Sequence, residues 1–176
     1  MPEIISGIGK ILQLMLQGLS TIPPVCLFVS LCRILTGKLK YCKKYLGQSV
    51  VMEDGSNFTI FREIIRFPVY HSCDECVFIV RFKFKHLSHK VNQVVSKIPM
   101  LLITGQPGFV AKYYAVNHQN GWWQGMYQWK SVKDLEAYKK SFVYRMMNKR
   151  AIPETIDFSE FPNQHLDEYI ENRLNM

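Results

Sequence analysis

Tyrosine and tryptophan residues gather between residues 109 and 144, and their side chains suit a small-molecule site. Each pairs a flat apolar ring with a hydrogen-bonding group, a combination that lines many ligand pockets. We therefore predict a pocket for a small hydrophobic or aromatic molecule. Its candidate ligand-binding residues are Tyr114, Trp122, Trp123, Tyr127, Trp129 and Tyr144. The alternative is that about half of them lie in the core or in a subunit interface, because successive strand residues face opposite ways.

Lys112 and His89 are candidate catalytic residues by residue type. A lysine beside aromatic rings could hold an oxyanion or an enolate, although a strand lysine is more often solvated or paired. His89 follows Ser88, a predicted helix N-cap, and could contact a ligand there. His118 belongs to a predicted hairpin loop, so we expect it to be exposed. The sequence contains no Gly-rich phosphate loop, Ser-His-Asp order or paired-carboxylate motif.

The five cysteines do not form a recognisable disulfide framework, because their number is odd and their density low. Reduced thiols and a cytoplasmic location fit best. Cys73 and Cys76 form a CxxC motif with His71 nearby, which resembles half a zinc site. The chain has no second CxxC or HxxxH motif, and a strand follows this one, whereas a redox dithiol would begin a helix. We expect no metal and favour incidental thiols over metal or redox chemistry.

The periodicity of apolar residues and the turn signals predict a βαββαβ order followed by one more helix. The expected elements are a strand at 76–85, a helix from Ser88 that Pro99 kinks or ends, strands at 109–117 and 122–129 joined by Asn120-Gly121, a helix opened by a capping box from Ser131 to Asp134, a strand at 155–161 and a helix at 163–174.

The predicted elements should bury specific faces. We expect the first strand to have one clearly apolar face, which carries Phe78, Val80 and Phe82. Each long helix should bury one apolar stripe. The predicted stripes are Val91, Val94, Val95, Ile98 and Leu102 in the first helix, and Val132, Leu135, Tyr138, Phe142 and Met146 in the second.

This order is that of the ferredoxin-like α+β fold, a four-stranded antiparallel sheet with two helices on one face. The other face of the sheet has nothing predicted to cover it. Pairing two such sheets across a two-fold axis would cover both, so the topology predicts a homodimer that forms an α+β barrel around a small-ligand pocket.

Residues 103–140 add a family resemblance. Pro107-Gly108-Phe109 opens a strand that contains Lys112, Gly125-x-Tyr127 lies in the next strand, and Glu136-Ala137-Tyr138 follows an acidic helix start. In this order and spacing, the chain resembles small bacterial monooxygenase-like proteins with a dimeric α+β barrel, which are related to antibiotic-biosynthesis monooxygenases. The resemblance covers about residues 76–174.

The resemblance implies a cofactor-independent oxygenation of a phenolic or polycyclic substrate. In related monooxygenases an Asn, a Trp and an Arg hold the substrate, which makes Asn117 and Arg145 further catalytic candidates beside the two neighbouring tryptophans. The competing hypothesis is a non-catalytic dimer that binds a small hydrophobic ligand. An enzyme would need a closed pocket with a base and an oxyanion donor, whereas a binding module would need only an apolar pocket.

The N-terminal part differs from the rest in charge and pattern. Residues 1–50 carry six Lys or Arg and one acid, and the remaining residues carry sixteen against thirteen. Nucleic-acid binding by the main domain is therefore not indicated. Residues 4–19 have the spacing of an amphipathic helix, Pro23-Pro24 breaks it, and a second apolar run, 25–35, ends near Gly37.

These N-terminal runs are too short or too interrupted for a transmembrane span, and they lack the order of a signal peptide. Two alternatives stay open: residues 1–45 lie on a membrane surface with Lys38 to Lys44 near anionic headgroups, or they pack against protein. Residues 50–66 predict a hairpin turning at Asp54-Gly55. The expected organisation is a helical segment at 1–47, a hairpin at 48–70 and the α+β-barrel domain at 71–176.

Overall fold

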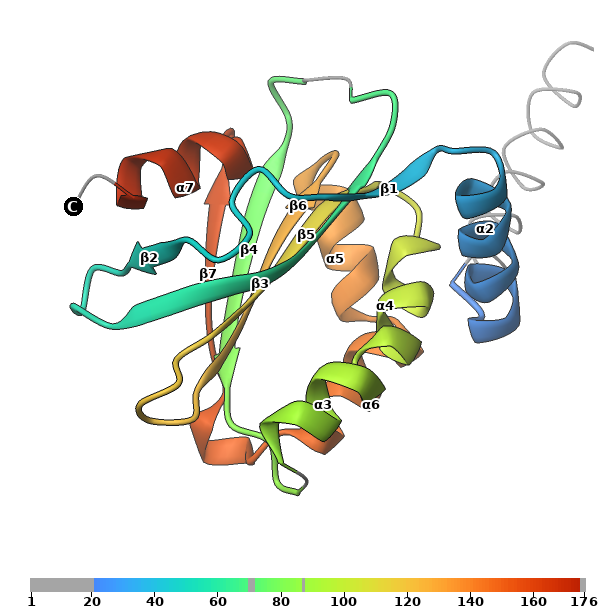
Figure 1. Ribbon diagram of the computed structural model, residues 1–176. Helices are drawn as coiled ribbons and strands as arrows, with labels where there is room; N and C mark the ends of the chain where they lie inside the picture. The colour runs from blue at the N-terminus through green and yellow to red at the C-terminus, as the bar shows by residue number, and fades with distance from the viewer. Residues whose placement is uncertain (1–20, 70–71, 87, 175–176) are drawn as a thin grey trace, which may run out of the picture.

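One antiparallel sheet organises the residues that this computed structural model describes, which are 21–69, 72–86 and 88–174 (Figure 1). Its strand order is β1-β3-β5-β6-β4-β7. The short strand β2 also pairs with β3 but is not part of this order. The elements are α2 (Pro23–Leu35), β1 (Leu39–Cys42), β2 (Ser49–Val51), β3 (Asn57–Arg66), β4 (Cys76–Phe82), α3 (His89–Val95), α4 (Lys97–Thr104), β5 (Phe109–Val116), β6 (Trp123–Trp129), α5 (Val132–Lys139), α6 (Phe142–Arg150), a short 3-10 turn (Pro153–Thr155), β7 (Asp157–Pro162) and α7 (Leu166–Leu174).

The ferredoxin-like unit runs from β4 to β7. In chain order it reads β4, α3–α4, β5, β6, α5–α6, β7, and its strands lie in the order β5-β6-β4-β7. The two central strands are therefore the first and third of the unit, as the βαββαβ topology requires. The predicted α+β fold class is confirmed.

The N-terminal hairpin extends this sheet. β2 and β3 pair around Gly55, whose φ of 76° belongs to the left-handed region that glycine tolerates. β3 then pairs with β5, and β1 pairs with β3. The run 25–35 lies in α2, which ends two residues before Gly37 at a φ of 66°. The predicted amphipathic helix at 4–19 lies outside the described residues.

Each predicted long helix is a pair of shorter helices. α3 ends and α4 begins around Ser96, so Pro99 lies in the first turn of α4, where its missing N–H costs no hydrogen bond. The Ser131 hydroxyl caps α5 by accepting from the Asp134 N–H, as predicted. The Ser141 hydroxyl then caps α6 by accepting from the Tyr144 N–H, so a second helix begins where one continuous helix was expected.

The expected burial of these stripes is wrong at several positions. Val91, Val94 and Ile98 are exposed, as are Val132 and Phe142. On α3 the inward positions are polar, because buried Asn92 and Ser96 bind arginine side chains from elsewhere in the fold. The helices form where the apolar periodicity predicts them, but several residues of the predicted apolar stripes face solvent.

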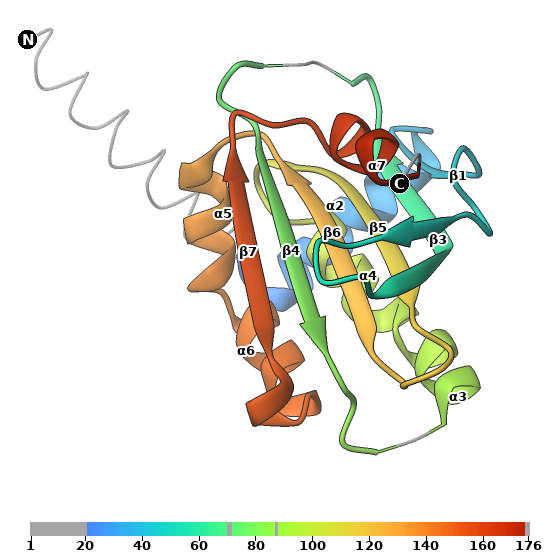
Figure 2. The ribbon, with the colours of Figure 1, turned by 90° about the vertical axis from the view of Figure 1, so that its left-hand side faces the viewer.

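Both faces of the sheet are covered, which corrects the expectation of one bare face. The helix-side core includes Phe78 and Val80, and a second core includes Val77 and Ile79 on the opposite side of β4. Figure 2 shows α7 and β2 in front of the sheet and α2 and α4 behind it. α7 covers the second face because its apolar residues recur along one side. Those residues are Leu166, Tyr169 and Ile170.

Candidate functional site

Five of the six predicted aromatic residues, all except Trp122, lie in the helix-side core, which we call the aromatic chamber. Lys112 on β5 lies opposite Tyr127 on β6. The Lys112 Nζ atom is 4.3 Å from the centre of the Tyr127 ring and 4.1 Å from that of Tyr114. Lys112 is only 2% exposed. Burial, reinforced by the nearby cations Arg62 and Arg150, lowers the pKa of Lys112 well below its ordinary value.

A stack of rings continues from Tyr127 toward α5 and α6. Trp129 and Tyr138 stack at 4.7 Å, and Tyr138 meets Tyr144 edge-on at 5.4 Å. A cavity of about 20 Å³ lies between Tyr127, Tyr138 and Tyr144. That volume holds about one water molecule, so in this conformation the aromatic chamber is a packed core and not a substrate pocket.

Two polar atoms in the aromatic chamber are buried without a hydrogen-bond partner among the described residues. They are the Tyr114 hydroxyl and the Trp129 Nε1 atom. Buried polar groups are normally satisfied, and exceptions call for a water or a functional explanation.

The other sequence candidates lie away from this cavity. The Trp123 Nε1 atom donates to His89 Nδ1 at 3.0 Å, and the two rings stack. Asn117 directly follows β5, and its side chain accepts from the backbone N–H groups of residues 119 and 120 in the hairpin loop. Trp122 packs against the core on the α7 side, under Lys83. Arg145 is exposed on α6, and its guanidinium donates to the Lys140 carbonyl at the end of α5.

A larger pocket lies on the opposite face of the sheet, beside the start of α7, and we call it the α7 pocket. Its volume is about 330 Å³, within the range of small-molecule sites. Its apolar lining is Ile65, Phe67, Val69, Val110, Ala111 and Leu166. Its polar lining is Cys42, Lys44, Glu75, Tyr113, Gln128, His165 and Asp167. An apolar cleft with a few convergent polar groups is the usual form of a ligand site.

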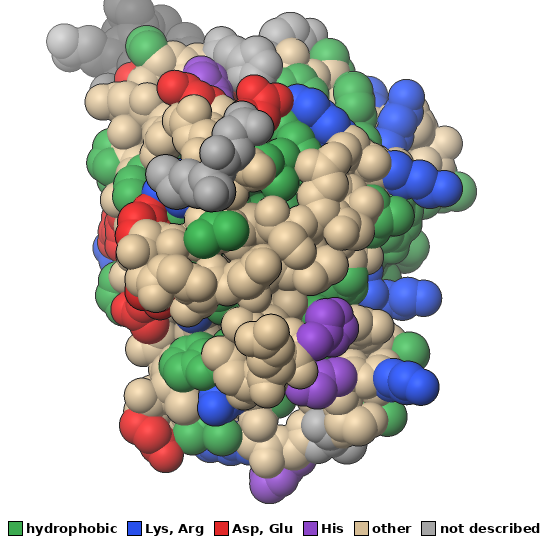
Figure 3. Space-filling model, turned by 60° about the vertical axis from the view of Figure 1, so that its left-hand side comes forward, with side chains coloured by type: hydrophobic (Ala, Val, Ile, Leu, Met, Phe, Trp, Pro, Cys, Tyr) green, Lys and Arg blue, Asp and Glu red, His purple; other side chains and the backbone are tan. Residues whose placement is uncertain are grey.

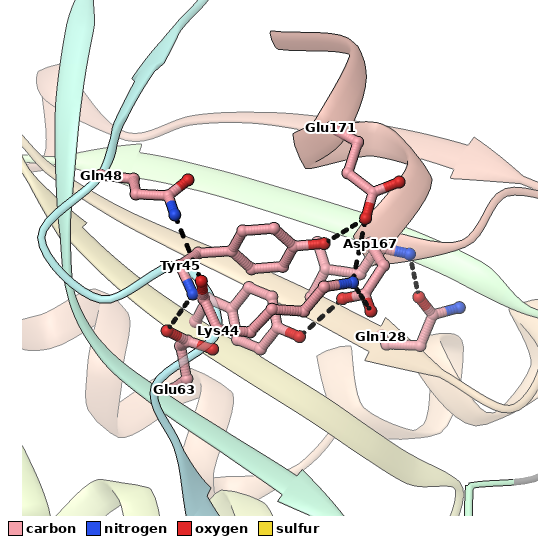
Figure 4. Close-up of polar contacts among 9 residues, drawn as sticks. Lys44, Tyr45, Gln48, Glu63, Gln128, Asp167 and Glu171 are labelled. Atoms are coloured by element: carbon pink, nitrogen blue, oxygen red, sulfur yellow. Dashed lines mark hydrogen bonds and ion pairs between the residues drawn. The ribbon is translucent and has the colours of Figure 1, made fainter. Parts of the chain in front are cut away.

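The Asp167 carboxylate anchors one polar network of the α7 pocket (Figure 4). It accepts a hydrogen bond from the Tyr113 hydroxyl at 2.7 Å and an ion-pair contact from Lys44 at 3.0 Å. Lys44 also reaches Glu171 at 2.9 Å and lowers the pKa of that carboxyl. Burial raises the pKa of Tyr113, so its hydroxyl stays protonated and acts as a donor.

The Glu75 carboxylate anchors a second polar network. Glu75 is 1% exposed, and its Oε2 atom lies 2.7 Å from His165 Nδ1 and 2.9 Å from the Gln128 amide nitrogen. His165 is partly exposed and lines the α7 pocket. A buried carboxylate bonded to one imidazole nitrogen fixes the tautomer and the orientation of the ring, which is the arrangement of many general bases. His165 is therefore a candidate general base of the α7 pocket.

Neither Cys42 nor the CxxC pair has the features of a reactive site. Burial raises the pKa of Cys42, and the negative charges of Glu63 and Asp167 raise it further. Its thiol is therefore a poor nucleophile. Cys73 is exposed, whereas Cys76 is buried at the start of β4, where burial raises its pKa. Within the described residues, no group of three His, Cys, Asp or Glu side chains could hold a metal ion.

Sequence reasoning missed the residues of the α7 pocket because they are far apart in the chain. Glu75 and His165 are 90 positions apart, and Tyr113 and Asp167 are 54 apart. One local signal was available. Glu63 in β3 and Gln128 in β6 lie next to apolar strand residues, and both are buried. A buried polar residue of this kind needs a partner, which indicates a polar network on that face of the sheet.

No protein-family model matches this chain, and no curated protein does. Among solved structures, it resembles a ferredoxin-fold protein from Listeria monocytogenes described as related to antibiotic biosynthesis monooxygenases. The identity is 8% and the TM-score 0.49, over 65% of this chain and 68% of that protein. A monooxygenase-like protein from Listeria innocua gives 9% identity and a TM-score of 0.48, over 63% of this chain and 66% of that one.

A protein from Fusobacterium nucleatum described as a candidate monooxygenase gives 8% identity and a TM-score of 0.47 over 61% of this chain. This chain spans about half of that protein's length, 49%. Likenesses this remote establish neither an activity nor a substrate. The fold assignment therefore rests on the strand order of this chain, and its function must be argued from its own residues.

Proposed function

We propose that the chain binds a small apolar or aromatic molecule with a phenol or enol group in the α7 pocket and removes a proton from it. The observation that carries this proposal is the position of the His165–Glu75 pair in the wall of a 330 Å³ pocket that is otherwise largely apolar. The apolar wall would hold the rings of the ligand. His165 would accept the proton, and the buried Glu75 carboxylate would stabilise the imidazolium that forms.

The reaction class that follows is cofactor-independent oxygenation. Removing a proton from an activated CH₂ group gives a carbanion, which can pass electrons directly to dioxygen. The CH₂ group becomes a carbonyl, one oxygen atom enters the product, and the other leaves as water with the two hydrogens. Lys44 lines the same pocket, and an enolate oxygen that replaced one of its two carboxylate contacts, with Asp167 or Glu171, would lie beside its ammonium group.

Oxygen uptake by the full chain, with anthrone and a panel of polyphenols as probes, tests this proposal. We expect uptake that falls at least about 100-fold in kcat for His165→Ala, since a general base contributes about 10²–10⁴-fold. His118→Ala changes an exposed loop histidine and should leave uptake unchanged. If the unaltered chain binds a probe but takes up no oxygen, the protein is a non-catalytic binding module. If oxygen uptake falls equally in His165→Ala and His118→Ala, His165 is not the base.

A further inference from the structure

Helix α2 presents its apolar side to solvent and its polar side to the protein. Its outward residues, Leu27, Phe28, Leu31, Ile34 and Leu35, recur at the spacing of one helical stripe, and all are exposed. Phe28 is 68% exposed and Leu35 86%. A soluble helix normally has the reverse arrangement, so a contiguous exposed stripe of this kind indicates an interaction surface.

The inward side of α2 is held by polar contacts and a close backbone approach. The buried Ser30 hydroxyl lies 2.6 Å from that of Thr104 on α4, and the Arg33 guanidinium donates to the Thr104 carbonyl. Gly105 allows the Cys26 carbonyl to approach, because a Cβ atom there would lie 1.9 Å from it. These contacts fix the apolar stripe in its outward direction.

Helix α3 has the same inverted arrangement. Its inward Asn92 accepts from Arg150 at 3.3 Å, and Arg62 donates to the Ser96 hydroxyl at 2.7 Å. Val94 on α3 and Ile98 at the start of α4 are among the most exposed apolar residues of the described chain. Figure 1 shows α2, α4 and α3 together along one flank, remote from α7. The exposed apolar positions therefore belong to one flank, which we call the α2–α3 flank.

The elements of this flank also lack acidic residues. No Asp or Glu occurs in residues 4–52 or 76–133, the stretches that contain α2, β1, α3 and α4. Exposed lysines lie on these elements or directly beside them. They are Lys38, Lys90 and Lys97. Thirteen of the fourteen acids lie in residues 53–75 and 134–171. Figure 3 shows most red side chains at one edge of the molecule and most blue ones at the other.

We infer that the α2–α3 flank docks on the surface of a bilayer that contains anionic lipids. Exposed apolar side chains with lysines on the same and adjacent elements suit the boundary between headgroups and acyl chains. Pairing this flank with the same flank of a second copy would place lysines against lysines, with no acidic residue to offset their repulsion. Binding to nucleic acid would use the lysines but would leave the apolar stripe exposed to water. Among the described residues, no helix is long and apolar enough to cross a membrane. Docking would therefore be peripheral.

Flotation of the full chain with vesicles tests the inference. We expect binding to phosphatidylcholine vesicles that contain phosphatidylserine, little binding to phosphatidylcholine alone, and weakening by salt. Leu31→Gln combined with Leu35→Gln should abolish binding. Lys90→Gln combined with Lys97→Gln should weaken it about 30-fold, from about 1 kcal/mol for each lysine. Phe158→Gln changes an exposed apolar residue of β7 and should have no effect.

Circular dichroism should show that every variant folds, since all of the altered side chains are exposed. Binding that the α2 variants do not weaken would overturn the inference. So would equal binding to both kinds of vesicle, or binding to duplex DNA in place of vesicles. A dimer that dissociates in the leucine variant without any vesicle binding would assign the flank to a second copy and would also overturn it.

Discussion

Lys112 places an amine in the core, and replacing it with methionine tests how that amine titrates. Burial, Arg62 and Arg150 lower the pKa of Lys112 in the folded protein, whereas a lysine in an unfolded chain titrates near about 10.4. Between the two pKa values the unfolded state binds one proton more than the folded state. The free energy of unfolding therefore rises with pH in that window, by about 1.4 kcal/mol per pH unit.

Lys112→Met removes this pH-dependent term and keeps a long, unbranched side chain between the two tyrosine rings. We expect the variant to be more stable than the unaltered protein at pH 7. Its advantage should shrink by up to about 1.4 kcal/mol for each pH unit up to pH 9. The assay is urea unfolding at pH 7, 8 and 9, and the quantity compared is the difference between the two proteins, in which the other titrating groups cancel.

Lys133→Met is the matched control, because this lysine is exposed on α5. Its difference from the unaltered protein should not vary over the same pH range. A constant difference for Lys112→Met from pH 7 to 9 would mean that the buried amine is charged in the folded protein. That result would refute the account of the aromatic chamber.

Two further stability predictions concern the helices. Ser131→Ala should cost about 1 kcal/mol of unfolding free energy in urea, because it removes the cap that accepts from the Asp134 N–H. Ser88→Ala should cost almost nothing, because that residue makes no side-chain cap bond, and equal costs would contradict the capping argument. Gly105→Ala should cost about 1–3 kcal/mol, since its Cβ atom must displace Cys26 by about 1 Å. An unchanged unfolding midpoint would contradict the close approach of α2 to α4.

Local signals in the sequence predicted local structure well. Asp54-Gly55 forms its hairpin because a left-handed glycine suits a tight turn, and Ser131 caps its helix because the partner lies three residues away. The βαββαβ order follows from such signals. The pairing of β1 with β3, and the placement of α7 across the second face of the sheet, depend on contacts between distant segments that no local pattern encodes.

The candidate site shows the same division. Lys112, Tyr114 and Tyr127 were separate site candidates, and they lie together because the pairing of β5 with β6 brings them into register. The Glu75–His165 pair joins β4 to the start of α7, and sequence periodicity gives no sign of it. Homodimerisation stays a prediction. Because the second face of the sheet is already covered within one chain, the topology no longer argues for a dimer. A sedimentation mass would test homodimerisation directly.

The most direct test of the α7 pocket as the ligand site is to fill it. Val110 lines the α7 pocket and is partly exposed, so tryptophan can be placed there without opening the core. Native mass spectrometry would measure binding of 2-naphthol to Val110→Trp and to Val132→Trp, a control on the exposed start of α5. We predict that the first variant loses the ligand and the control retains it. Equal binding by Val110→Trp and the unaltered chain would contradict the assignment of the site.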